Sequence, residues 1–211
     1  MEVKQDNLIN ALKIQPLIVV IRLESDFFDK PYKRDKLHLK IKKLSNYGIK
    51  NIEIGWDPNP EWVDLISEIK NDFHHLNIGA ASISSIEALN SILSLNLNYS
   101  MSPYFNKGIH IEAIKHNTLL IPGVSNTENF QEAINLGYKI IKIFPVSKLG
   151  VNFLNKLKEF KKSDIFFIGA GGIHSRDIKK LLGNGYNALA IGKGLKNQIP
   201  DEDLKKWLKN F

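Results

Sequence analysis

A lysine within an apolar run is the residue of this sequence best placed to do chemistry. Lys142 lies in Lys139-Ile-Ile-Lys-Ile-Phe-Pro145, a β-branched stretch that follows Gly137 and predicts a buried β-strand. Side chains alternate along a strand, so Lys142 shares one face with Ile140 and Phe144. A lysine removed from water has a lowered pKa, and its neutral amine attacks carbonyl carbons to form a Schiff base. The structural alternative is a lysine whose stem simply reaches water.

Two further predicted strands carry a single charge in the same phase. Arg22 lies near the end of the apolar run 17–23, and Glu53 lies within the run 51–56. If these faces point into a barrel, Arg22, Glu53 and Lys142 converge on one mouth and form an ion-paired set with catalytic potential. A structural salt-bridge cluster is the alternative. Three ionisable groups sharing the inward phase favour a functional site, because buried charges are seldom kept without a partner or a use.

Glycine-rich turns follow the last two predicted strands. They are Ile168-Gly-Ala-Gly-Gly-Ile173 and Ile191-Gly-Lys-Gly194. In barrels of alternating strands and helices, backbone N–H groups at this position often bind phosphate, and glycine lets the backbone approach the anion closely. Lys193 could add positive charge to such a site. His174, directly after the first of these turns, could touch a ligand or lie on a surface loop.

The elements that position these residues alternate regularly along the chain. Strands and helices repeat about eight times at a spacing of roughly two dozen residues, which is typical of a (β/α)8 barrel. After a short leading helix (6–13), strands are expected at 17–23, 51–56, 76–82, 99–103, 119–124, 139–145, 165–171 and 188–192. Helices are expected at 34–47, 60–73, 85–95, 107–116, 127–136, 151–161, 176–182 and 201–210.

We therefore predict an α/β chain with one domain over residues 1–211, a (β/α)8 TIM barrel with a short N-terminal helix. Strands that are apolar on both faces fit a parallel sheet covered by helices. A doubly wound open sheet is the main competitor. No glycine-rich dinucleotide loop follows the first predicted strand, which counts against the Rossmann version of that fold.

Composition narrows the classes of function. Among the 211 residues there is no cysteine, which excludes disulfides, a thiolate metal site and a cysteine nucleophile. No apolar run is long enough to span a bilayer, and the first residues are too polar for a signal peptide, so we expect a cytoplasmic protein without a membrane partner. No pair of histidines has metal-site spacing with a carboxylate, so no metal is expected. The net charge of +7 raises the possibility of nucleic-acid binding, but only three arginines are present and the lysines are spread along predicted helices, so no nucleic-acid partner is expected.

From Leu17 to about Gly194 the chain resembles the 2-keto-3-deoxy-6-phosphogluconate (KDPG) and 4-hydroxy-2-oxoglutarate aldolase family. The resemblance implies a class I, metal-free aldolase without a cofactor, on a (β/α)8 barrel that is commonly a homotrimer. It places the Schiff-base lysine at Lys142 and the general acid/base glutamate at Glu53. The motifs that carry it are Val19-Val-Ile-Arg22, Ile52-Glu-Ile54, Gly79-Ala-Ala-Ser-Ile83, Ser102-Pro103, Ile121-Pro-Gly-Val124, Lys142-Ile-Phe-Pro145, Gly171-Gly-Ile173 and Ile191-Gly192.

The resemblance also implies a substrate and the residues that hold it. The substrate would be a 2-keto-3-deoxy (phospho)sugar acid or 4-hydroxy-2-oxoglutarate, cleaved to pyruvate or glyoxylate-type products. Arg22 and the turn around Ser82 would hold its carboxylate, and Pro103 and Phe144 would form an apolar wall. A distal phosphate would be received by the turns that contain Gly171, Gly172, Gly192, Lys193 and Gly194.

Four departures from the family pattern concern recognition rather than chemistry. The family's Gly-Ala-Gly-Thr reads Gly79-Ala-Ala-Ser82 here, and its Pro-Thr-Gly-Gly reads Gly169-Ala-Gly-Gly172. Gly55 and Asp57 follow the glutamate strand where many members have Thr and then Arg, and this Asp would repel an anionic substrate if it faced the site. Gly194 replaces a frequent serine. Two other functions therefore stay open: a phosphate-binding barrel isomerase, decarboxylase or synthase, and a divergent paralogue that binds a sugar phosphate or a partner protein.

Overall fold

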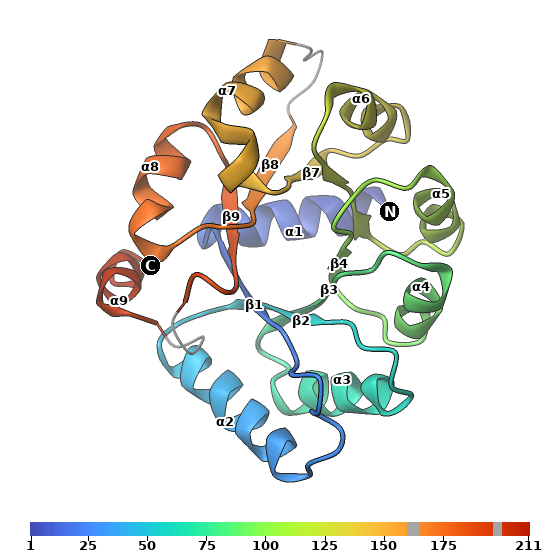
Figure 1. The fold of residues 1–211 in the computed structure, drawn as a ribbon, viewed down its shortest axis with the longest axis vertical. Coiled ribbons are helices and arrows are strands. Elements are labelled where there is room, and N and C mark those ends of the chain that lie inside the picture. Colours follow the sequence, from blue (N-terminus) through green and yellow to red (C-terminus); the bar gives the residue numbers. More distant parts are fainter. Residues whose placement is uncertain (160–164, 196–199) are drawn as a thin grey trace.

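The computed structural model of the chain describes residues 1–159, 165–195 and 200–211. Within these ranges, parallel strands form one sheet that curves into a barrel surrounded by helices (Figure 1). The strands are β1 (Leu17–Ile21), β2 (Asn51–Gly55), β3 (Asn77–Ala81), β4 (Tyr99–Met101), β5 (Leu120–Ile121), β6 (Gly123–Val124), β7 (Ile140–Ile143), β8 (Phe166–Ala170) and β9 (Ala188–Ile191). The helices are α1 (Glu2–Ile14), α2 (Tyr32–Asn46), α3 (Glu61–Asp72), α4 (Ile86–Leu93), α5 (Lys107–Lys115), α6 (Thr127–Asn135), α7 (Val146–Glu159), the 3-10 turn η1 (Ser175–Asp177), α8 (Ile178–Gly183) and α9 (Glu202–Leu208).

The predicted strand 119–124 is divided into β5 and β6, which lie at opposite edges of the sheet. The strand order is β5-β4-β3-β2-β1-β9-β8-β7-β6, so β5 and β6 lie at its two ends. They flank Pro122, which has no N–H to donate to a ladder. Counting β5 and β6 as one interrupted strand gives the eight strands of a (β/α)8 barrel. The predicted fold class is confirmed.

Several element boundaries differ from the predictions. Helix α7 starts at Val146 instead of Val151, and it bends at Gly150, whose φ of +68° is left-handed. The predicted helix 176–182 is divided into η1 and α8. The predicted end of the helix 151–161 lies outside the described residues. None of the helices in the described ranges is both long and apolar enough to cross a bilayer.

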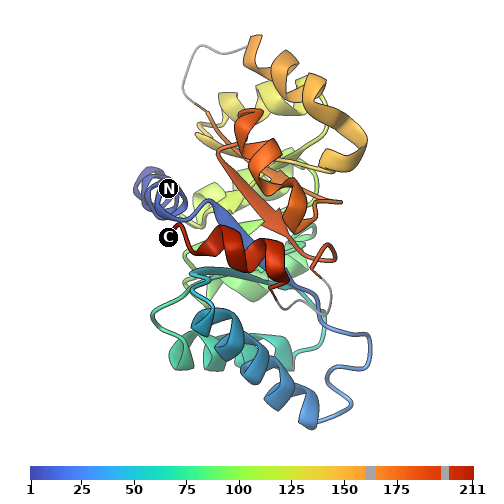
Figure 2. The same ribbon diagram turned by 90° about the vertical axis from the view of Figure 1, so that its left-hand side faces the viewer.

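Helix α1 covers the amino-terminal ends of the strands, as Figure 2 shows from the side. Gln5 in α1 donates to the carbonyl of Gly137 (3.1 Å) and accepts from the N–H of Lys139 (2.8 Å), just before β7. Gln15, after α1, likewise accepts from the N–H of Lys50 (2.8 Å), just before β2. Both glutamines are buried. The carboxyl ends of the strands are therefore the end of the barrel at which a site can open.

A ladder of asparagines fills the same closed end. Asn51 is fully buried and donates to the carbonyl of Leu17 at 3.1 Å. Asn77 donates to the side-chain oxygen of Asn51 (2.9 Å), and Asn98 donates to that of Asn77 (2.8 Å). These bonds link the amino ends of four neighbouring strands. The polar side chain that precedes Glu53 on the inward face of β2 thus has a structural role.

A buried histidine lies behind the divided strand. His110 in α5 is inaccessible to solvent, and its Nδ1 donates to the carbonyl of Asn106 at 2.8 Å. Its Nε2 lies 3.3 Å from the Ser102 hydroxyl, which also accepts the N–H of Gly123 (3.1 Å). Burial lowers the pKa of His110 to about 4. The ring is therefore neutral at physiological pH and ties α5 to the end of β4.

This histidine should make the fold sensitive to acid. The pKa of His110 is about 4 in the native state and ordinarily 6.5, so the unfolded chain binds more protons between these values. The free energy of unfolding should therefore fall as the pH drops from 6.5 to 4, by about 3 kcal/mol from this residue. Denaturant unfolding curves at pH 7 and pH 4 measure this loss of unfolding free energy. His110→Leu should remove about 3 kcal/mol of the loss, whereas His74→Leu, at an exposed position, should leave it unchanged. Equal acid sensitivity of wild type and His110→Leu would contradict the assignment.

Candidate functional site

A cavity of about 480 Å³ opens at the carboxyl ends of the strands. Its walls come from both halves of the chain, as expected where all strands of a barrel end together. The two catalytic candidates, Glu53 and Lys142, line it. So do all nine candidates for substrate binding: Arg22, Ser82, Pro103, Phe144, Gly171, Gly172, Gly192, Lys193 and Gly194.

Glu53 and Lys142 are almost completely withdrawn from solvent, with exposed fractions of 2% and 6%. Burial raises the pKa of Glu53, and the charges of Lys142 and Arg22 offset only part of that rise. Burial lowers the pKa of Lys142; the Glu53 carboxylate opposes this and Arg22 adds to it. The two groups thus have pKa values that move toward each other. An amine and a carboxyl in this state can exchange protons with a bound molecule near neutral pH.

The amine of Lys142 is held against an aromatic wall. Its Nζ lies 5.5 Å from the centre of the Phe144 ring. On the neighbouring strand β6, Gly123 is the register partner of Lys142. A Cβ atom on Gly123 would come within 2.6 Å of the carbonyl oxygen of Pro103. Glycine at this position therefore lets the Pro103 segment approach the lysine strand.

One carboxyl oxygen of Glu53 makes no hydrogen bond to the described residues. This oxygen, Oε1, is buried. Sequence reasoning missed the neighbouring Tyr99, whose ring fills the space beside Gly79, since a Cβ there would come within 2.6 Å of it. Burial and, to a lesser extent, the Glu53 carboxylate raise the pKa of Tyr99, so its hydroxyl stays protonated. The only signal in the sequence was a hydroxyl-bearing side chain in the predicted strand 99–103.

Arg22 lies beyond the end of β1, at the exposed mouth of the cavity. Its Nη1 donates to the Ser82 hydroxyl at 3.3 Å. Arg22, Glu53 and Lys142 thus converge on one mouth as expected, and their charges act on one another. Among the described residues, however, no direct ion pair joins them: the guanidinium bonds to a hydroxyl, and Glu53 is left for another partner. Ser82 has a φ of +68°, a conformation that costs a non-glycine residue free energy and often marks a ligand site. The guanidinium and this hydroxyl could together hold a carboxylate.

Close packing explains the two glycine turns. Gly172 has a φ of +71°, and a Cβ there would lie 2.4 Å from the Ser147 side chain. At Gly194 a Cβ would lie 1.8 Å from the carbonyl oxygen of Ile173, so the two turns pack against each other. A serine at position 194 would not fit this arrangement. Lys193 is exposed beside this contact.

The structure shows which of the other residues that depart from the family pattern line the cavity. Ala81 and Ala170 line the cavity, as does His174, for which the sequence left both possibilities open. Asp57 accepts the N–H of Asn59 at 2.9 Å and is not among the described residues that line the cavity. The repulsion that Asp57 would cause inside the site therefore does not arise.

A larger hollow of about 830 Å³ runs outside the barrel along α2. Several lysines line it, among them Lys33, which pairs with Glu24 and Asp26. No buried acid–base pair faces this hollow among the described residues. We therefore regard the smaller cavity as the candidate active site.

The chain is similar in sequence to one protein family and to two named relatives. The model of the KDPG and KHG aldolase family matches residues 8–207. The 2-dehydro-3-deoxy-phosphogluconate aldolase of Treponema pallidum (strain Nichols) is 22% identical over 115 residues, which are 54% of this chain and 55% of the relative. The 2-dehydro-3-deoxy-6-phosphogalactonate aldolase of Escherichia coli (strain K12) is 22% identical over 138 residues, 65% of this chain and 67% of the relative. The chain thus spans about half the length of the first relative and two thirds of the second.

A solved structure shows the same fold. The 2-keto-3-deoxy-6-phospho-gluconate aldolase of Zymomonas mobilis ATCC 29191 superposes with a TM-score of 0.77 at 18% identity. The match covers 97% of this chain and 94% of that one.

Neighbouring charges should shift the pKa of Lys142 in opposite directions. Glu53→Gln removes a charge that raises this pKa, so the pKa should fall further; Arg22→Gln removes a charge that lowers it, so the pKa should rise. The pH dependence of acylation of Lys142, read by peptide mass spectrometry, measures both shifts. Exposed Lys115 is the internal reference and should react equally in all three proteins. An unchanged Lys142 profile in both variants would mean that the three groups are not coupled.

Proposed function

Because the chain belongs to the KDPG and KHG aldolase family, we propose that it cleaves a 2-keto-3-deoxy (phospho)sugar acid or 4-hydroxy-2-oxoglutarate through an imine on Lys142. The observation that carries the proposal is the buried pair of Lys142 and Glu53 in one open cavity, with pKa values moved toward each other. Burial keeps part of the amine neutral, as nucleophilic attack on a ketone requires.

Imine formation is the first part of the proposed reaction. The neutral amine of Lys142 attacks C2 of the 2-keto acid and gives a carbinolamine. Glu53 in its protonated form donates to the departing hydroxyl, and water leaves. The product is a protonated imine, and Glu53 is now a carboxylate. Its raised pKa suits it to give up and regain this proton.

Bond cleavage follows from the positive charge on the imine. Glu53 takes the proton of the C4 hydroxyl, directly or through one water, and the electrons of the C3–C4 bond move into the imine to form an enamine. The C4 fragment leaves as an aldehyde. Glu53 then returns the proton to C3, and hydrolysis of the imine releases pyruvate and restores Lys142. All proton transfers thus use one carboxyl, which fits its unoccupied oxygen.

Substrate recognition is assigned to the rest of the cavity. Arg22 and Ser82 would hold the carboxylate next to the keto group, and Pro103 and Phe144 would confine the carbon chain. A distal phosphate or carboxylate would be bound at the far end by backbone amides of the glycine turns and by Lys193. These candidates are Gly171, Gly172, Gly192 and Gly194.

The proposed reaction uses no organic cofactor and no catalytic metal, and residues 1–211 would act as one catalytic domain. From the family resemblance we also expect a homotrimer in the cytoplasm.

The nucleophile can be identified by trapping. Incubation with pyruvate and borohydride should attach a reduced pyruvate adduct to Lys142 in the wild type and leave none in Lys142→Ala. Lys193→Ala removes the other lysine that lines the cavity and should still be trapped, because Lys193 is placed at the distal end. Peptide mass spectrometry locates the adduct, and circular dichroism checks that Lys142→Ala is folded. Trapping of Lys142→Ala at the wild-type rate would assign another nucleophile; no trapping of the wild type would favour an isomerase, a decarboxylase or a divergent paralogue.

The role of Glu53 can be tested without removing the nucleophile. Glu53→Gln keeps the size of the side chain but cannot transfer a proton, so pyruvate should still be trapped on Lys142, more slowly than in the wild type, while turnover of 2-keto-3-deoxy acids falls by roughly 10²–10⁴-fold. A coupled assay for released pyruvate over a panel of such acids measures this and names the preferred aldehyde half. Turnover of Glu53→Gln at the wild-type level would remove Glu53 from the mechanism.

A further inference from the structure

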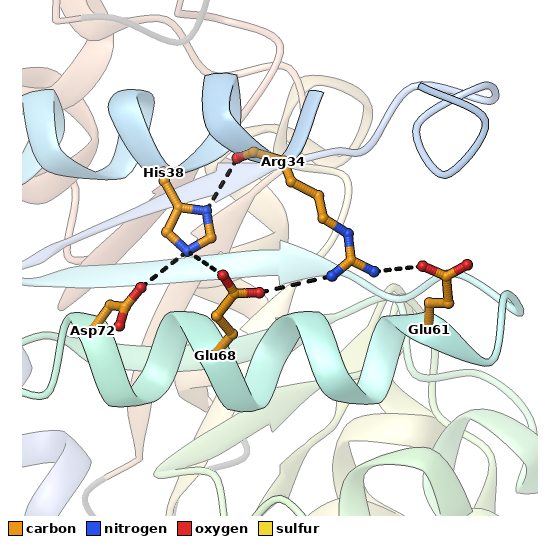
Figure 3. Close-up of polar contacts among 5 residues, drawn as sticks. All are labelled: Arg34, His38, Glu61, Glu68 and Asp72. Atoms are coloured by element: carbon orange, nitrogen blue, oxygen red, sulfur yellow. Dashed lines mark hydrogen bonds and ion pairs between the residues drawn. The ribbon is translucent and has the colours of Figure 1, made fainter. Parts of the chain in front are cut away.

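Three potential metal ligands meet between α2 and α3, on the outside of the barrel (Figure 3). His38 projects from α2. Glu68 and Asp72 are four residues apart on α3, so they share one face of that helix. The Nε2 atom of His38 lies 3.2 Å from Asp72 Oδ2 and 3.6 Å from Glu68 Oε1. This cluster could not be predicted from the sequence, because its members come from two helices and include only one histidine.

The ring of His38 is fixed with Nε2 toward the carboxylates. Its Nδ1 lies 3.0 Å from the carbonyl oxygen of Arg34, which can only accept, so Nδ1 carries a hydrogen. In the neutral ring Nε2 then has a lone pair. This atom is buried and makes no hydrogen bond to any described residue, even though a carboxylate oxygen is 3.2 Å away. Nε2 thus faces both carboxylates (Figure 3), and a cation placed between them, a metal ion or a proton on Nε2, would offset their charges.

We propose that His38, Glu68 and Asp72 bind a divalent transition-metal ion, with Zn²⁺ as the best match. A tetrahedral zinc ion binds nitrogen and oxygen at about 2.0–2.2 Å, which places its ligand atoms roughly 3.3–3.6 Å apart. The two separations from Nε2, 3.2 and 3.6 Å, match this spacing, and all three ligand atoms lie within 4.8 Å of one another, so an ion would have to draw the two carboxylates together by at most about an ångström. A histidine with two carboxylates is a donor set that suits zinc, and a water would complete the tetrahedron.

Neighbouring groups orient the ligands, as is usual around bound metals. Arg34 lies 3.7 Å from the other oxygen of Glu68 and pairs with Glu61 at 2.5 Å, so Glu68 is held from the side away from His38. The ring of Phe73 packs 6.0 Å from the ring of His38. The side chain of His38 is 21% exposed and that of Asp72 is 54% exposed, which leaves an open path for the ion.

A bound ion would fasten α2 to α3. These helices follow β1, which leads to Arg22, and β2, which carries Glu53, but none of the three ligands lines the aldolase cavity. The ion would stabilise the native state by mass action and take no part in aldol cleavage. The competing arrangement is a protonated His38 that only forms ion pairs with the two carboxylates.

The test is a zinc titration of the chelator-treated full chain by isothermal calorimetry and by thermal unfolding. The wild type should bind one Zn²⁺ per chain at this site and unfold at a higher temperature when zinc is present. His38→Ala and Asp72→Asn should each weaken binding by about 100-fold or more, at least the effect of losing an outer-shell partner. Asp72→Asn is nearly isosteric at a half-exposed position, so it covers the case in which His38→Ala fails to fold.

Two control variants separate this site from adventitious binding. His116→Ala disrupts another histidine–carboxylate pair (3.2 Å to Glu112), which has only one carboxylate. Glu132→Gln removes an exposed carboxylate that pairs with Lys107, outside the His38 cluster. Both should keep the wild-type affinity, and aldolase turnover should be equal with and without zinc. The absence of saturable zinc binding by the wild type, or binding that survives both ligand substitutions, would overturn the proposal and leave an ion-pair cluster.

Discussion

The candidate site depends on one constraint, the free-energy cost of burying the amine of Lys142 and the carboxyl of Glu53 inside the same barrel. Either group alone would lose its charge there, because removal from water disfavours the ionised form of both. Together they offset part of that cost through their mutual attraction. Burial is nevertheless the larger effect, so the pKa of Glu53 stays raised and that of Lys142 stays lowered. A pair balanced in this way is ready for proton transfer, whereas a tight ion pair would hold both charges in place.

The two ends of the barrel differ in how the buried polar side chains named here are hydrogen-bonded. At the amino-terminal end, the glutamines next to α1 and the asparagine ladder give buried polar atoms their hydrogen bonds. At the carboxyl end, Glu53 Oε1 has no partner among the described residues. A buried unsatisfied oxygen costs roughly 1–3 kcal/mol. The fold can tolerate this cost because the closed end, the apolar strands and the surrounding helices are well packed, and the open oxygen remains where a substrate can bond to it.

Residue alternation was enough to predict that Lys142 and Glu53 face the same interior cavity, but not the polar contacts around them. A period of two placed Lys142 and Glu53 on inward faces, and glycines after the last strands marked the two turns that now line the cavity. The partner of Arg22 could not be predicted, because its side chain is long and Ser82 is sixty positions away in a strained turn. Tyr99 and the His38 cluster were missed for a similar reason. Both depend on which side chains of separate elements come into contact, and a pattern within one element carries no such information.

The same reasoning bears on how the proposed enzyme would distinguish substrates. A hydroxyl in a binding turn selects by direction, since its hydrogen bond requires a defined geometry, whereas a lysine ammonium attracts anions with much less angular preference. In this chain Ala170 and Gly194 contribute no hydroxyl to the distal end, and the contact of Gly194 with Ile173 leaves no room for one. Lys193 and His174 stand at that end instead. Selection there would rest on charge and on backbone amides more than on side-chain hydrogen bonds. Elsewhere on the cavity wall, Arg22 donates to Ser82, and a substrate carboxylate bound there, as proposed, would meet a directional contact. The site should therefore be strict about the 2-keto acid half of its substrate and tolerant of the anion at the other end.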